Sequence, residues 1–201
     1  MIKLIGTHDS ATGEKPNNFL SFLGTPIAKC QTKTILQQLK AGVRMFDLRV
    51  KPYSLYINER GKYPNIDIKH LVLGHGLCDY SITFFDALAT ISQYATEHKT
   101  KMYILVAYES GKLTEDTQKK FIDDVKKLVS SFPKLTLLEI DKRNPTWTVI
   151  YYNKSCGITY RPEQVVLEGW KLLLPFPWFW NKFKKYNNKE EKGVYSLRDF
   201  V

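Results

Sequence analysis

The sequence predicts an α/β fold that resembles a TIM barrel in a distorted or reduced form. Short apolar segments alternate with longer amphipathic segments, which is typical of a mainly parallel sheet or barrel. The chain has 201 residues, whereas a complete eight-stranded barrel has about 250 and rarely fewer than about 200. Six clear strands can be identified, so two more would have to come from the C-terminal part.

The six expected strands are short and mostly apolar. Met102–Tyr108 is a continuous apolar run, which is typical of a strand buried on both faces. The other segments end at glycines or polar residues, where a strand gives way to a loop. The six segments are 3–6, 43–50, 71–73, 102–108, 135–140 and 146–152.

Three helices are expected between these strands, over 34–41, 83–98 and 114–131. Their apolar residues recur every three or four positions, so each helix has one face for the core. Thr114 is a suitable N-cap for the last helix, and Gly42 ends the first.

Composition indicates one globular domain over residues 1–201, because 43% of the residues are hydrophobic and 25% are charged. The longest apolar runs are far shorter than the roughly 20 residues of a membrane-spanning helix. The N-terminal residues lack a secretory signal pattern. We therefore expect a cytoplasmic or peripheral membrane protein, or a component of an assembly built inside a cell.

The net charge is +10, from 30 basic and 20 acidic residues. A positive surface attracts polyanions, among them anionic lipid, nucleic acid and acidic proteins. No nucleic-acid-binding module is recognisable and the lysines are spread over helix faces, so a nucleic-acid partner is not expected. The three cysteines, Cys30, Cys78 and Cys156, are far apart in the sequence. This spacing argues against a disulfide framework and against a thiolate-built zinc site, and it favours buried free thiols.

Reactive side chains follow four of the expected strands. The carboxyl ends of parallel strands meet at one mouth of a barrel, so these side chains are expected to share a pocket. They are His8 and Asp9 after the first strand, Asp47 and Arg49 in the second, His75 after the third and Glu109 after the fourth.

These residue types are suited to phosphoryl transfer without a metal. Two imidazoles can act as general base and general acid near neutral pH. An arginine can bind phosphate oxygens through paired hydrogen bonds, and a carboxylate can orient an imidazole. Gly6, Gly74 and Gly76 flank the two histidines, whereas His70 and His98 lack this setting and are interpreted as structural. The simpler alternative is that His8 and His75 are also ordinary structural residues.

Three motifs make the sequence resemble the catalytic domains of phosphatidylinositol-specific phospholipases C. They are Ile5–Ser10, Gln37–Arg49 and Leu73–Gly76, and their order and spacing agree over about residues 3–110. The segment 51–70 is longer than expected for the family and resembles an inserted loop. The resemblance implies a distorted TIM-type barrel.

The resemblance also implies a role for each residue. His8 would take a proton from the inositol 2-hydroxyl, which attacks phosphorus, and His75, supported by Asp9, would protonate the departing diacylglycerol oxygen. Arg49 would bind a phosphoryl oxygen, and Asp47 would help to orient the site. The first product would be an inositol cyclic phosphate.

Members of the family neutralise the negative charge of the substrate phosphate in one of two ways. Some use calcium held by carboxylates, and others use an arginine. Arg49 stands at one of the carboxylate positions, so no metal cofactor is expected and calcium is disfavoured. Glu109 matches another calcium-binding position, and an ion pair with Arg49 would explain its presence. Glu109 and Asn153 are candidate substrate-binding residues, and Asn153 is also a candidate for the late polar group that orients the general base.

The tail over 154–201 is aromatic and basic. Aromatic residues with lysines favour a membrane–water boundary, so Trp170, Trp178, Phe179 and Trp180 are candidate contacts with an anionic membrane. Alternatively, these aromatic residues pack on the barrel or on a partner subunit.

Two other functions compete with a phospholipase. A non-catalytic scaffold of the same fold could serve in a larger assembly. A glycerophosphodiester phosphodiesterase would share the barrel layout, but such enzymes favour a Glu-x-Asp metal pair where this chain has Asp47-Leu48-Arg49.

Overall fold

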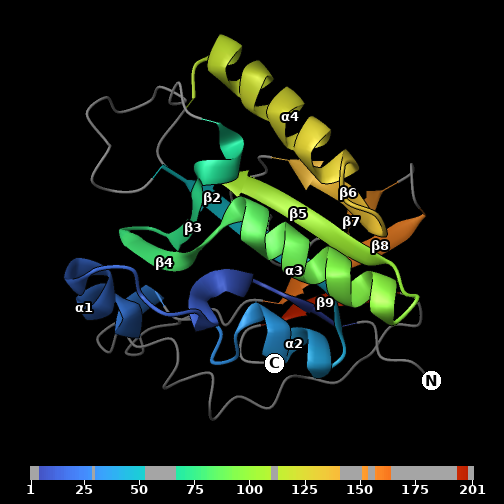
Figure 1. Ribbon diagram of the computed structural model, residues 1–201, viewed down its shortest axis with the longest axis horizontal. Helices are drawn as coiled ribbons and strands as arrows, with labels where there is room; N and C mark the ends of the chain where they lie inside the picture. The colour runs from blue at the N-terminus through green and yellow to red at the C-terminus, as the bar shows by residue number, and fades with distance from the viewer. Residues whose placement is uncertain are drawn as a thin grey trace.

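The computed structural model describes residues 5–28, 30–52, 67–109, 113–140, 151–153, 157–163 and 194–198. Nine strands form one sheet in this part of the chain (Figure 1). They are β1 (Ile5–Thr7), β2 (Val43–Lys51), β3 (Val72–His75), β4 (Cys78–Thr83), β5 (Met102–Tyr108), β6 (Leu135–Ile140), β7 (Tyr151–Asn153), β8 (Ile158–Glu163) and β9 (Val194–Arg198).

Four α-helices and two short 3-10 helices connect the described strands. They are α1 (Phe19–Ala28), α2 (Ile35–Lys40), α3 (Phe84–Glu97), α4 (Glu115–Ser130), η1 (Ser10–Gly13) and η3 (Ile68–His70). Thr114 caps α4 by accepting a hydrogen bond from the Thr117 backbone N–H, as the sequence predicts. Thr34 caps α2 in the same way and forms a capping box with Gln37.

The sheet is mainly parallel, which confirms the predicted α/β class. The parallel pairs are β1–β2, β2–β5, β5–β6, β1–β9 and β8–β9. Among the described residues β6 and β7 are not paired with each other, so the sheet does not close into a full barrel. This open sheet agrees with the reduced form of the barrel that the chain length predicts.

The C-terminal tail supplies two strands, as the strand count requires. β8 and β9 both lie in the segment 154–201, and β9 pairs in parallel with β1, with Ile5 opposite Ser196. The last described strand, β9, therefore lies beside the first, β1, in the sheet.

The core lies between the sheet and the helices. Phe46, Leu48 and Val50 on one face of β2 are fully buried, as are Phe84 and Leu88 of α3. Figure 1 shows α3 running alongside β5, and α4 packs against β6. Asp47, Arg49 and Lys51 lie on the other face of β2, away from α3, whereas Arg44 shares the face of Phe46 and its guanidinium lies 5.7 Å from the centre of the Tyr94 ring of α3.

Two elements differ from the sequence prediction. β3 is antiparallel to β2 and forms a hairpin with β4, whereas the sequence predicts a short strand ending in a loop. Gly76, at a positive φ of 56°, allows the tight turn of this hairpin. Helix α1 was not predicted. Residues 53–66 of the expected inserted loop and 146–150 of the last expected strand lie outside the described residues.

No helix among the described residues is long and apolar enough to cross a bilayer.

Candidate active site

Strand β2 supplies the polar face of the site. Side chains alternate between the two faces of a strand, so Asp47, Arg49 and Lys51 share the face opposite the buried Phe46, Leu48 and Val50. A strand with charged residues at every second position can sit in a core only if those charges have partners. The neighbouring segments provide these partners.

A gap in strand pairing opens one edge of β2 to side chains. β5 pairs with one edge of β2 over Met45–Val50. On the other edge, β1 pairs as far as Phe46 and β3 begins at Val50. The stretch 47–49 between them faces the point where the chain leaves β1 at His8 and Asp9. The topology therefore brings these residues together with Asp47 and Arg49.

Arg49 is the centre of this arrangement. Its Nη2 lies 2.9 Å from His8 Nε2, and its Nε contacts Asp9 Oδ1 and lies 3.5 Å from Asp47 Oδ2. Its Nη1 lies 3.6 Å from Glu109 Oε2, which confirms the predicted ion pair. Burial alone would lower the pKa of Arg49, but the Asp9, Asp47 and Glu109 carboxylates raise it above its usual range.

Asp9 lies among both histidines and the arginine. Its Oδ2 is 3.3 Å from His8 Nε2 and 3.5 Å from His75 Nε2. Burial alone would raise the pKa of Asp9, but the charge of the Arg49 guanidinium is the main cause that lowers this pKa to about 2. Asp9 has left-handed backbone angles (φ 43°, ψ 56°), and its N–H donates to Asp47 Oδ2 at 3.2 Å. Asp47 therefore holds the turn that aims Asp9 into the site.

The hydrogen bonds give the two histidines opposite roles. A guanidinium can only donate, so the 2.9 Å contact with Arg49 makes His8 Nε2 an acceptor with a lone pair. A carbonyl can only accept, so His75 Nδ1 donates to Ala28 O at 2.8 Å, while its Nε2 faces the Asp9 carboxylate. His8 is arranged to receive a proton, and His75 is arranged to carry one.

A buried ion pair that the sequence did not indicate supports the hairpin of His75. Lys51 Nζ lies 2.8 Å from Asp79 Oδ1 and donates to Gly76 O at 2.8 Å. The Gly76 N–H donates to Glu109 Oε1 at 3.1 Å, so the turn is held from two sides. Lys51 can take this position only because residue 74 is a glycine: a Cβ on Gly74 would lie 2.4 Å from Lys51 Cδ. Lys51 and Asp79 therefore act as positioning residues for His75.

Replacing Lys51 with methionine is expected to lower the free energy of unfolding by about 3–5 kcal/mol, because Asp79 would remain buried without its partner. The measurement is urea unfolding followed by circular dichroism. Lys120→Met is the matched control, since its ion pair with Asp124 is largely exposed and is worth about 0–1 kcal/mol. Equal losses in the two variants would contradict the role of Lys51.

Sequence reasoning also missed an exposed apolar surface beside the site. Helix α1 follows the first motif, and four of its large apolar side chains are more than half exposed. Leu77 in the β3–β4 turn, next to His75, is 91% exposed. We call this set the α1 surface; it consists of Phe19, Leu20, Phe22, Leu23 and Leu77. The apolar run was visible in the sequence, but its exposure was not, because an apolar run normally indicates burial.

Helix α1 is connected to the hairpin of His75. It packs against β4 (Figure 1), and Ser21, the buried residue of its first turns, accepts a hydrogen bond from the Asp79 backbone N–H at 2.8 Å. The last residue of the helix, Ala28, accepts the hydrogen bond from His75. The same helix thus carries the exposed apolar residues and orients one of the site imidazoles.

The remaining predicted residues have different outcomes. Cys30 and Cys78 are buried free thiols, as predicted, whereas Cys156 lies outside the described residues. The backbone of Asn153 pairs with Ile158 at the end of β7, and its side chain is not among those described. The predicted membrane contacts Trp170, Trp178, Phe179 and Trp180 lie outside the described residues.

Comparison with known proteins identifies relatives of this arrangement. The sequence model of the family "Phosphatidylinositol-specific phospholipase C, X domain" matches residues 20–132, more than half of the chain. This range contains Asp47, Arg49, His75 and Glu109 and begins after His8 and Asp9. No curated protein matches the chain.

The fold is similar to solved structures of the Staphylococcus aureus phosphatidylinositol-specific phospholipase C. One structure, from work on the membrane binding of that enzyme, has 12% identity and a TM-score of 0.65, with 100% of this chain and 86% of that chain covered. A double mutant of the same enzyme has 15% identity and a TM-score of 0.61, with 98% and 85% covered. The TM-scores show a shared fold, and the open sheet described above is a reduced version of it.

Proposed function

The chain belongs to the phosphatidylinositol-specific phospholipase C X-domain family, and we propose that it cleaves phosphatidylinositol-like lipids with His8 as general base and His75 as general acid. The family makes it a phospholipid-cleaving phosphodiesterase. The observation that carries the finer proposal is the pair of histidines on one carboxylate oxygen of Asp9, one arranged to accept a proton and the other to donate one.

The proposed reaction is a substitution at phosphorus. His8 Nε2 takes the proton of the inositol 2-hydroxyl, whose oxygen forms a bond to phosphorus while the bond from phosphorus to the diacylglycerol oxygen breaks. His75 Nε2 gives its proton to that leaving oxygen, and the inositol cyclic phosphate is the first product. Asp9 stabilises the positive charge on His75, and Asp47 keeps Asp9 in place through the Asp9 N–H.

Arg49 supplies the positive charge that the phosphate requires. Its guanidinium holds His8, Asp9, Asp47 and Glu109 together. When a substrate hydroxyl replaces Arg49 Nη2 as the hydrogen-bond donor to His8 Nε2, Arg49 Nη2 becomes able to donate to a phosphoryl oxygen. Glu109 then keeps the far end of the guanidinium in position and supports substrate binding in this way. Asn153 is retained as a candidate contact to the headgroup.

Calcium does not fit this site. The carboxylates that would bind it are Asp9, Asp47 and Glu109, and each of them lies on the Arg49 guanidinium. Calcium takes about six to eight oxygen ligands, so it would have to draw all three carboxylates away from the cation that they hold. We therefore propose that catalysis needs no metal cofactor.

The α1 surface is proposed to bring the enzyme to its lipid. Its side chains are apolar and exposed, Leu77 is two residues from His75, and α1 contacts His75 through Ala28. These side chains would enter the boundary region of a bilayer, while the net charge of +10 favours anionic lipid. The phospholipid substrate and the membrane surface would thus be reached from the same side. The tail residues Trp170, Trp178, Phe179 and Trp180 are proposed as further contacts.

Changing Leu20 and Leu23 together to serine is expected to weaken binding to vesicles of anionic lipid at least about tenfold, because each buried leucine contributes roughly 1.5–3 kcal/mol. Vesicle co-sedimentation measures the binding. Leu36→Ser on α2 is the control, since Leu36 is also exposed but lies outside the α1 surface. Unchanged vesicle binding of the double variant would exclude the α1 surface, and a loss in a Trp178→Ala, Trp180→Ala variant would assign docking to the tail.

The proposed function is tested by product analysis in excess EDTA. Phosphatidylinositol and glycerophosphodiesters are supplied separately, and the products are identified by phosphorus NMR. We expect inositol cyclic phosphate from phosphatidylinositol, with EDTA present. Turnover of glycerophosphodiesters alone would favour a glycerophosphodiester phosphodiesterase, loss of activity in EDTA would contradict metal independence, and no turnover of any phosphodiester would favour a non-catalytic scaffold.

A further inference from the structure

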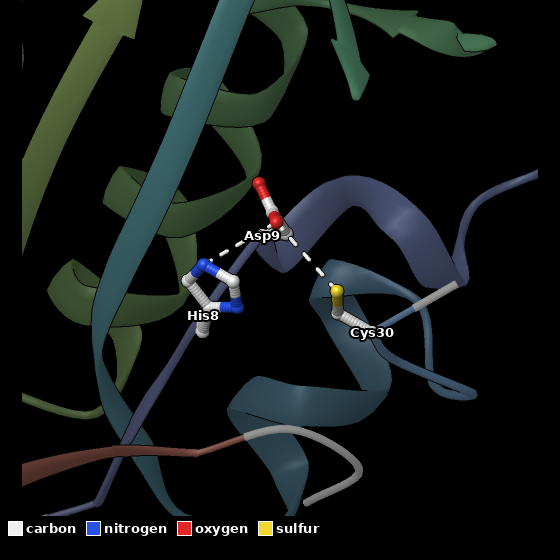
Figure 2. Close-up of side chains that lie close together, drawn as sticks. All are labelled: His8, Asp9 and Cys30. Carbon is white, nitrogen blue, oxygen red and sulfur yellow. Dashed lines mark hydrogen bonds and ion pairs between the residues drawn. The ribbon is translucent and has the colours of Figure 1, made fainter. Parts of the chain in front are cut away.

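We propose that His8, Asp9 and Cys30 form a binding site for a thiophilic divalent cation such as Zn²⁺, and that its occupation inhibits the enzyme. Figure 2 shows the three side chains converging from the end of β1 and from the segment that follows α1. They offer an imidazole nitrogen, a carboxylate oxygen and a sulfur, which are the three ligand types that zinc accepts in proteins. Sequence spacing did not indicate this site, because only the fold brings Cys30 to His8.

The distances between the ligand atoms suit a tetrahedral ion. Zinc binds nitrogen and oxygen at about 2.0–2.2 Å and sulfur at about 2.3 Å, which places neighbouring ligand atoms roughly 3.3–3.6 Å apart. Asp9 Oδ2 lies 3.3 Å from His8 Nε2 and 3.6 Å from Cys30 Sγ. Ligand atoms of all three residues lie within 4.8 Å of one another. A small movement of these side chains would suffice to coordinate one ion.

The segment that carries Cys30 is fastened to the segment that carries His8. Thr12 Oγ1 accepts hydrogen bonds from the Cys30 N–H at 3.0 Å and from the Gln31 N–H at 2.8 Å. The Gln31 side-chain amide donates to His8 O at 2.9 Å. Cys30, Gln31, Thr12 and His8 are all buried. This network fixes the ligand backbones relative to one another before an ion arrives, which is how outer contacts support a metal site.

The charges around the site favour a cation. Asp9, Asp47 and Glu109 contribute three negative charges, and Arg49 and protonated His75 contribute one positive charge each, which leaves a net charge of −1. Binding of a divalent ion with release of the Cys30 thiol proton to solvent changes this to 0, so the added charge is compensated. The guanidinium gives up its contact with His8 Nε2 and keeps Asp47 and Glu109. No oxidant or reductant is needed.

A fourth donor, which becomes available once His75 Nε2 releases its proton to solvent, lies beside the same carboxylate. His75 Nε2 is 3.5 Å from Asp9 Oδ2, and its Nδ1 donates to the Ala28 carbonyl. Histidines that bind metals typically donate their other ring nitrogen to such an acceptor. The sulfur distinguishes this site from a calcium site, because calcium prefers oxygen ligands alone.

Inhibition would follow because the ion binds to the lone pair of His8 Nε2. A metal on His8 Nε2 occupies the atom that would accept the hydroxyl proton. This consequence depends on the proposed function, whereas binding of the ion does not. The two can therefore be tested separately.

Binding is tested by titrating chelator-treated full-length protein with Cd²⁺ and following the thiolate-to-metal absorption band, with Zn²⁺ affinity measured by calorimetry. Cys30→Ala is compared with Cys78→Ala, a buried thiol outside the cluster. We expect one ion per chain in the wild type and in Cys78→Ala. In Cys30→Ala the absorption band should be lost and Zn²⁺ should bind at least about tenfold more weakly. Cys30→Ser gives the same comparison if Cys30→Ala does not fold.

The outcomes separate the site from the enzyme. Absence of the band in the wild type, or its persistence in Cys30→Ala, overturns the site. Zinc is expected to inhibit the wild type and Cys78→Ala, and to inhibit Cys30→Ala at least about tenfold less relative to that variant's own metal-free rate. Ion binding by a protein that cleaves no phosphodiester would support the site and contradict the proposed function. Inhibition that is equal in all three proteins would overturn the inhibitory role of the site.

Discussion

Replacing His8 with alanine is expected to lower kcat for phosphatidylinositol by about 10²–10⁴-fold, because the attacking hydroxyl would lose its general base. KM should change little, since His8 acts on the proton that moves and the α1 surface binds the lipid. The measurement is the rate of cyclic phosphate formation from vesicles at several substrate concentrations. His70→Ala is the matched control, because His70 is exposed on η3 and contacts none of the site residues described above.

The roles of the two histidines can be separated by the leaving group. His75→Ala is expected to show a similar loss with the natural lipid, whose alcohol must be protonated as it departs. With a phosphodiester whose leaving group is a nitrophenol, protonation is no longer needed, so His75→Ala should recover most of its activity and His8→Ala should not. Recovery by His8→Ala instead would reverse the assignment of base and acid.

The parts of the fold that the sequence predicted are those that depend on local patterns. The apolar spacing of α3 and α4, the cap at Thr114 and the apolar run of β5 are each determined by residues near in sequence. The grouping of His8, Asp9, Asp47 and Arg49 was also predictable, because β1 is parallel to β2 and ends opposite Phe46, just before Asp47. The expectation of two strands in the tail followed from the count of six clear strands against the eight of a complete barrel.

The parts that could not be predicted depend on pairing between distant segments. The β3–β4 hairpin pairs back onto β2, so the prediction that His75 follows a parallel strand was wrong, although His75 does reach Asp9. The buried ion pair of Lys51 was not predictable, because Lys51 follows a strand in the sequence and only the hairpin places Asp79 beside it. Cys30 gave no signal as a metal ligand, because its partners lie in the first motif. Apolar patterning identifies large apolar residues but does not tell which of them, as in α1, remain exposed.

Arg49→Ala is expected to lower kcat by at least about 10²–10³-fold, because the phosphate would lose its principal source of positive charge. It should also lower the free energy of unfolding by about 3–5 kcal/mol at neutral pH, since it leaves three carboxylates of the site without their shared cation. Activity and urea unfolding are measured on the same preparations. Arg49→Lys separates charge from shape, because an ammonium cannot contact His8 and the three carboxylates at once in the way that a planar guanidinium does.

The free energy of unfolding of Arg49→Ala should also depend on pH differently from that of the wild type. In the wild type the pKa of Asp9 lies at about 2, below its ordinary value of 3.8, so ionised Asp9 stabilises the fold above pH 3.8 and this contribution is lost as pH falls toward 2. Without Arg49 the pKa of Asp9 rises, because burial then dominates. The stability difference between wild type and Arg49→Ala should therefore be largest at neutral pH and shrink as the pH is lowered through this range. A difference that is constant with pH, together with a kcat close to that of the wild type, would mean that Arg49 does not organise the site.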